Sequence, residues 1–109
     1  MTDTVVTDTI VIVATVAIDT YLVDTLMRDL VAHDRTSSSF LVFLWLWRRT
    51  HALGKESHRI SLARLAEATG LSKSAVQSAV RNLARRKLVR VARKSKTAVP
   101  EYFVHKTWR

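Results

Sequence analysis

Two short helical patterns joined by a tight turn dominate residues 60–83, ISLARLAEATGLSKSAVQSAVRNL, and limit the folds available to this chain. Ala66 is small enough for two helices to cross closely, and Gly70, four residues later, can adopt the positive φ that ends the first helix. Ser72 offers a side-chain oxygen that caps the second helix, and Val76 is placed to pack back against the first. The segment therefore predicts two packed helices that meet at Gly70.

The second predicted helix has one apolar face and one polar face. Its apolar stripe comprises Ala75, Val76, Ala79, Val80 and Leu83, and its opposite face carries Lys73, Ser74, Gln77, Ser78 and Arg81. These exposed residue types suit base edges in a major groove, because Arg and Lys bond guanine, Gln bonds adenine and Ser bonds either. A surface helix of an unrelated protein would more often carry Glu and Lys four residues apart. The pattern favours nucleic-acid binding over a generic helical hairpin.

Two segments with alternating polarity follow the second helix. Leu88–Arg93 and Glu101–His105 have the two-residue period of strands, and the connection between them, Lys94–Pro100, begins with KSK. The pattern predicts an antiparallel hairpin with a basic tip.

Together these segments resemble a winged helix-turn-helix protein over roughly residues 20–106. The resemblance is closest to the multiple-antibiotic-resistance-regulator type and to the helix-turn-helix modules of replication initiator proteins. It implies that the second motif helix enters the major groove, that the wing reaches the flanking minor groove or backbone, and that Ile60 adds a short third strand.

The same resemblance assigns site residues by position. It places Ser72, Lys73, Ser74, Gln77, Ser78 and Arg81 in the major groove, and Arg93, Lys94 and Lys96 at the wing tip. Two interpretations remain for four further cations: they contact phosphates, or they belong to a solvated helix end. These residues are Arg85, Arg86, Lys87 and Arg90.

The N-terminal region reads as a strand followed by a helix. The run Thr9–Ile18 is dominated by β-branched residues and is apolar on both alternating faces, so we expect a strand that is covered twice. Asp19 or Thr20 can then cap a helix. Its apolar stripe is Leu22, Val23, Leu26, Met27, Leu30 and Val31.

A second apolar helix is predicted before the motif. Capping hydroxyls in Thr36–Ser39 precede the run Phe40–Trp47, and Arg48 and Arg49 supply cations suited to a helix C-terminus. This run is apolar all round, and its aromatic residues are better explained by core packing than by ligand or base stacking. Because a small domain rarely buries every side of a helix, we expect part of its surface to meet another subunit. A loop is expected over Thr50–Arg59.

Charge is unevenly distributed along the 109 residues, whose net charge is +9. Residues 1–35 hold six Asp against two Arg, whereas residues 36–109 hold 16 Lys and Arg against three Glu. A chain of this length forms one domain, and the resemblance implies that it is a single winged-helix domain, residues 1–109. The charge asymmetry predicts that this domain has two functional parts. Residues 1–35 are the expected dimerisation region, because no long C-terminal helix is available for that role, and residues 36–109 are the expected basic DNA-binding core.

Several classes of protein are excluded by what the sequence lacks. Without Cys it forms no disulfide framework or thiolate zinc site, and the histidines are scattered, so we expect no metal and no cofactor. No phosphate-binding glycine loop or nucleophile elbow is visible, so we expect no enzyme. The N-terminus has no basic segment typical of a secretion signal, and the longest uncharged apolar run is too short to span a bilayer. These features predict a cytoplasmic protein that associates with the nucleoid when bound to DNA.

The sequence thus predicts an α+β winged helix-turn-helix fold, mainly helical, with a small antiparallel wing sheet and an extra N-terminal strand. The expected function is sequence-specific binding of double-stranded DNA by a homodimer, most simply as a ligand-free transcriptional regulator. One alternative is a replication-initiator or plasmid-maintenance factor, which would also bind DNA. A winged-helix scaffold for protein–protein interaction is the alternative from another class.

Overall fold

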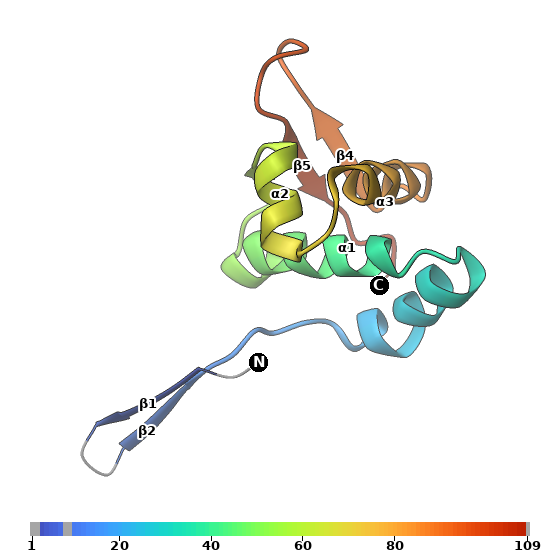
Figure 1. Ribbon diagram of the computed structural model, residues 1–109. Coiled ribbons are helices and arrows are strands. Elements are labelled where there is room, and N and C mark those ends of the chain that lie inside the picture. The colour runs from blue at the N-terminus through green and yellow to red at the C-terminus, as the bar shows by residue number, and fades with distance from the viewer. Residues whose placement is uncertain (1–2, 8–9, 109) are drawn as a thin grey trace.

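The computed structural model describes residues 3–7 and 10–108 as a helical body with a three-stranded sheet and a separate two-stranded hairpin (Figure 1). The N-terminal region contains β1 (Asp3–Thr7), β2 (Ile10–Ala14) and the π-helical segments η1 (Leu22–Leu26) and η2 (Asp29–His33). The remainder contains α1 (Ser37–Arg49), the 3-10 turn η3 (His51–Leu53), β3 (Ser57–Arg59), α2 (Leu62–Thr69), α3 (Lys73–Arg85), β4 (Val89–Ala92) and β5 (Glu101–Val104). The α+β winged-helix prediction is confirmed.

The turn between α2 and α3 has the geometry that its sequence predicts. Gly70 adopts φ 74°, and its N–H donates to the carbonyl of Ala66 at 2.9 Å, which ends α2. Ser61 caps α2 by accepting from the N–H of Arg64, and Ser72 caps α3 by accepting from the N–H of Ala75. The helix-turn-helix is therefore built from local signals at both ends of α2 and at the start of α3.

The sheet is antiparallel in the order β3-β5-β4. Tyr102 in the central strand pairs with His58 on one side and Val91 on the other. The third strand is Ser57–Arg59, so the expectation that Ile60 would form it is wrong. Ile60 still donates its N–H to the carbonyl of Pro100, but the chain must turn there because Ser61 already caps α2.

Helix α1 forms the centre of the core. Its buried residues are Ser39, Phe40, Val42, Phe43, Leu46 and Trp47, and it packs against α2, α3, η2 and β5. The expected helix is confirmed, with Thr36 as its N-cap. Most of its apolar surface is covered within the chain rather than by another subunit, and Leu41, at 44% exposure, is its exposed large apolar residue.

The N-terminal strand differs from its prediction. It ends at Ala14 rather than Ile18, and it is not alone, because β2 pairs antiparallel with β1 of the same chain in the register Val5↔Ile12. The TVVT sequence of β1 is itself β-branched, and two residues separate the strands, which favours a local hairpin. Thr9 lies outside the described residues, and residues 15–19 belong to no helix or strand.

The helical region after the strand also differs from its prediction. Leu22, Leu26 and Leu30 are buried, whereas Val23, Met27 and Val31 are 37–48% exposed although the predicted stripe included them. The buried residues are spaced four positions apart and lie along one face of η1 and η2, whereas the residue that follows each of them lies beside that face, in solvent. The region therefore presents three apolar side chains to solvent.

Asp34 anchors this N-terminal region to the end of α3. Its carboxylate bonds the guanidinium of Arg86 at 2.5 and 2.6 Å and accepts from the side-chain amide of Asn82 at 3.0 Å. The Asp34 side chain is 6% exposed, and the bonds from Arg86 hold its pKa well below the usual range despite its burial. A charged contact between distant parts of the sequence thus fixes the C-terminal end of α3.

Candidate nucleic-acid interface

The outer face of α3 carries the predicted base-reading residues. Lys73, Ser74, Gln77, Ser78 and Arg81 are all exposed. The helix buries the opposite side through Val76, Ala79 and Leu83. Ser72, which the resemblance also assigns to the major groove, is exposed. Its side-chain oxygen accepts from the N–H of Ala75, so Ser72 stabilises the start of α3.

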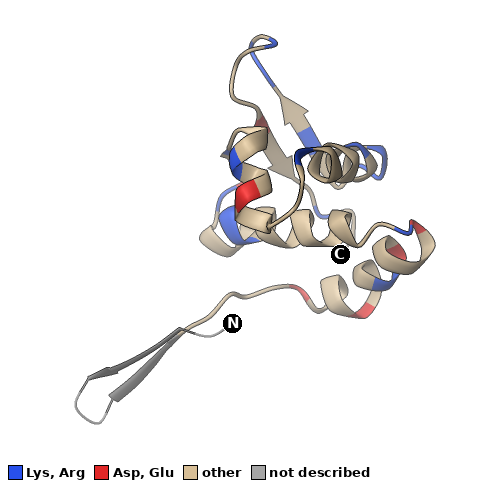
Figure 2. Cartoon of the chain, in the orientation of Figure 1, with Lys and Arg blue, Asp and Glu red and all other residues tan. Residues whose placement is uncertain are grey.

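The wing places the second predicted group on the loop between β4 and β5. Arg93, Lys94 and Lys96 are exposed there, and Figure 2 shows basic residues at the tip of this loop. The guanidinium of Arg93 donates to the carbonyl of Lys96 at 3.4 Å, and the N–H of Ala98 donates to Ser95 at 3.2 Å. The loop is thus a compact turn that projects Lys94 and Lys96 away from the sheet.

A groove joins the two predicted groups. Gln77 and Arg81 from α3 line it together with Val91 and Arg93 from the wing, and Tyr102 forms part of its wall. Its volume is about 280 Å³. The tertiary structure therefore brings the C-terminal half of the recognition face against the base of the wing. The remaining predicted residues lie outside the groove, at the start of α3 and at the wing tip.

The four unassigned cations have different environments. Arg86 is held in the Asp34 pair, and Arg85 donates to the side-chain carbonyl of Asn82, so these guanidinium groups have partners in the fold. Arg90 lies 4.0 Å over the ring of Phe103. Lys87 is exposed and adopts φ 62° where the chain leaves α3. Arg86 is therefore a structural residue, since its guanidinium is bonded to the buried Asp34 carboxylate, which also raises the pKa of Arg86.

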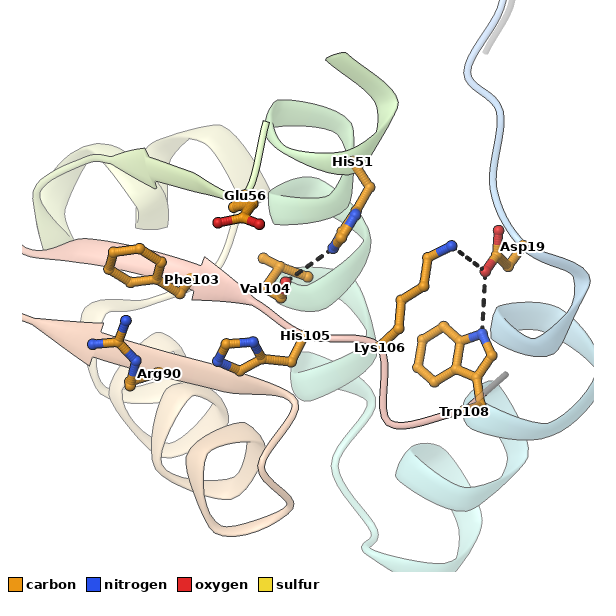
Figure 3. Close-up of a pocket in the computed structure, with 9 residues that line it drawn as sticks. All are labelled: Asp19, His51, Glu56, Arg90, Phe103, Val104, His105, Lys106 and Trp108. Atoms are coloured by element: carbon orange, nitrogen blue, oxygen red, sulfur yellow. Dashed lines mark hydrogen bonds and ion pairs between the residues drawn. The ribbon is translucent and has the colours of Figure 1, made fainter. Parts of the chain in front are cut away.

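A hollow of about 760 Å³ lies beside the C-terminal segment (Figure 3). The carboxylate of Asp19 pairs with Lys106 at 2.9 Å and accepts from the indole N–H of Trp108 at 3.1 Å. These bonds, led by that from Lys106, lower the pKa of Asp19, and the carboxylate does not act as the predicted helix cap. Trp108 also stacks on Tyr21 at 4.5 Å. The polar groups bond one another and tie residues 106–108 to the N-terminal region.

A second cationic cluster was missed by sequence reasoning. Arg49, Arg59 and Arg64 line a groove of about 850 Å³ that also contains Trp45 and His58. These residues come from α1, β3 and α2, and their spacing in the sequence forms no motif. Only the fold brings them together.

The described residues show neither a metal-binding cluster nor a membrane-spanning helix. In the described part of the chain, no three His, Asp or Glu residues are arranged to hold a metal ion. Among the described residues, no helix is long and apolar enough to cross a membrane.

Comparison with known proteins gives one match. The family model of bacteriophage replication protein O matches residues 17–103, which include the helix-turn-helix and most of the wing. No curated protein and no solved structure matches the chain significantly. The match supports the replication-initiator side of the resemblance and gives no support to the multiple-antibiotic-resistance-regulator side.

Proposed function

Because the chain belongs to the bacteriophage replication protein O family, we propose that it binds specific duplex sites in the initiation of phage DNA replication. The observation that carries this proposal is the continuous face formed by α3, the groove and the wing. Gln77 and Arg81 read base edges in the major groove, and Lys94 and Lys96 contact backbone or minor groove. The regulator function expected first from the sequence lacks comparable support.

The test is selection of bound sites from a pool of random duplexes, followed by affinity measurements over a range of salt concentrations. We expect one enriched sequence and an affinity for it that falls steeply with salt, because bound phosphates release counterions. Failure to enrich any sequence would contradict site-specific binding. Affinity for a protein partner that is insensitive to salt and to Lys or Arg neutralisation would favour the scaffold alternative.

Removing the wing cations should weaken binding to all duplexes alike. Lys94→Ala combined with Lys96→Ala is expected to reduce the salt dependence of log K by about 0.9 for each lost phosphate contact. The ratio of affinities for the selected site and a scrambled duplex should stay nearly constant, since phosphates carry no sequence information. A loss confined to the selected site would instead place base reading in the wing.

We also propose a homodimer formed through the β1–β2 hairpin. Two strands alone are marginally stable in water, and this hairpin lies apart from the three-stranded sheet (Figure 1). Pairing with the hairpin of a second copy gives each additional backbone partners and an apolar contact. Ile10→Lys with Ile12→Lys should therefore yield monomers in sedimentation velocity. Thr4→Lys with Thr7→Lys, which adds the same charge without removing an apolar side chain, is the control, and an unchanged mass for the Ile variant contradicts the assignment.

A further inference from the structure

The groove lined by Arg49, Arg59 and Arg64 lies on a different side of α2 from the predicted duplex interface. Leu62, in the first turn of α2, lines the groove between α3 and the wing, whereas Arg64 and Ala68 line this second groove. Figure 2 shows basic residues on α2 and at the end of α1, on the side away from α3. The two cationic surfaces are therefore separate.

Its cations are available to an anion. Among the described residues, Arg49 and Arg64 form no ion pair, and both are exposed. Arg59 pairs with Glu101 at 3.4 Å, but its side chain stays 62% exposed. Glu67 also lines the groove, but one carboxylate does not balance three guanidinium groups, so the net charge of the lining is positive.

Its wall is aromatic and apolar. The guanidinium of Arg49 lies 5.1 Å from the ring of Trp45, and His58 makes an edge contact with the same ring at 5.7 Å. Burial lowers the pKa of His58, as do the nearby charges of Arg49 and Lys55, which favours the neutral imidazole, so His58 adds a ring to the wall. Val99, 53% exposed on the wing, completes an apolar rim.

This groove can bind both parts of an unpaired nucleotide. Its guanidinium groups suit the phosphate, and its indole and apolar side chains suit the base. The phosphates of a single strand follow the cations, and its free bases can stack on aromatic rings or guanidinium planes. A duplex keeps its base faces stacked and offers only edges, which leaves the apolar wall of a concave groove unused. A peptide of Asp and Glu alone would satisfy the charge but has no flat ring for that wall.

We propose that this groove binds single-stranded DNA, at a site separate from the duplex-reading face. One chain would then hold both a duplex site and the strand released when a neighbouring duplex opens. This second activity does not depend on whether the α3 face recognises a specific sequence.

The experiment compares two double variants that each remove two positive charges. Fluorescence anisotropy of labelled oligothymidylate, which cannot form a duplex, measures single-strand affinity, and the selected duplex measures duplex affinity. Arg49→Ala with Arg64→Ala is expected to weaken oligothymidylate binding about tenfold or more, while duplex affinity changes less than about threefold. Lys94→Ala with Lys96→Ala is the charge-matched control and should weaken the duplex instead.

Two further measurements make the assignment specific. Trp45 packs against the core, so it is left in place, and photo-crosslinking of a halogenated oligothymidylate should label the segment that contains it. Saturating unlabelled duplex should leave most of the oligothymidylate bound. Full displacement by duplex, equal losses in both double variants, crosslinks confined to α3 or to residues 93–96 at the wing tip, or equal competition by a polyglutamate of the same charge would each overturn the proposal.

Discussion

Replacing both Gln77 and Arg81 with Ala is expected to abolish discrimination between the selected duplex and a scrambled one. Each good bidentate contact to a base is worth about 1 to 3 kcal/mol of discrimination, so the pair contributes about 2 to 6 kcal/mol. Both side chains are exposed, one helical turn apart, and they line the groove at the base of the wing. The loss should be large at the selected site and small on scrambled DNA.

The measurement is the ratio of the two dissociation constants at one salt concentration. Arg28→Ala is the control, because it removes one exposed positive charge, as the double variant does, from the N-terminal region away from α3. It should leave the ratio unchanged. Retained discrimination in the Gln77 and Arg81 variant, with circular dichroism showing an intact fold, would mean that α3 does not read the sequence.

Asp34→Ala is expected to destabilise the fold by about 3 kcal/mol, the lower end of the range for breaking a buried ion pair. The carboxylate is 6% exposed and the Arg86 side chain 29% exposed, so removing Asp34 leaves a largely buried guanidinium without its partner. Urea denaturation measures the free energy of unfolding. Asp29→Ala, which breaks a 3.9 Å pair with the exposed Arg28, should change that free energy by less than about 0.5 kcal/mol.

The Asp34 pair also predicts a dependence on pH. Because its pKa is lowered on folding, its contribution to stability is complete above the unfolded Asp value of about 3.9. The contribution is lost as the pH falls toward the lower pKa of the folded state. The natural chain should therefore lose more unfolding free energy between pH 5 and pH 3 than Asp34→Ala does. Equal losses would show that the pair does not stabilise the fold.

The local parts of the fold could be read from the sequence because their causes are local. Gly70 supplies a positive φ, Ser72 caps its own helix, and both effects depend on residues within a few positions. The exposed face of α3 follows in the same way from the helical period. The predicted site residues therefore lie where the motif places them.

The N-terminal region could not be read to the same accuracy. The sequence predicted one strand there, and the structure contains it as β2. The strand that pairs with it, β1, was not predicted. The predicted apolar stripe held two adjacent residues at each turn, but the fold buries only Leu22, Leu26 and Leu30 and leaves Val23, Met27 and Val31 exposed. The spacing of apolar residues in a sequence does not show how much of a helix surface the neighbouring elements cover.

By itself the sequence determined the helix-turn-helix, the wing and the exposed polar face of α3, since caps, glycine conformation and periodicity act over a few residues. Only the tertiary structure decided which cations form ion pairs inside the fold and which stay exposed. Arg86 forms an ion pair with Asp34, 52 positions away. Arg49 and Arg64, from different helices, line the same groove. A count of charges along the sequence does not distinguish these three guanidinium groups. What distinguishes them is a neighbouring carboxylate or aromatic ring, and those neighbours are in place only after distant segments have packed together.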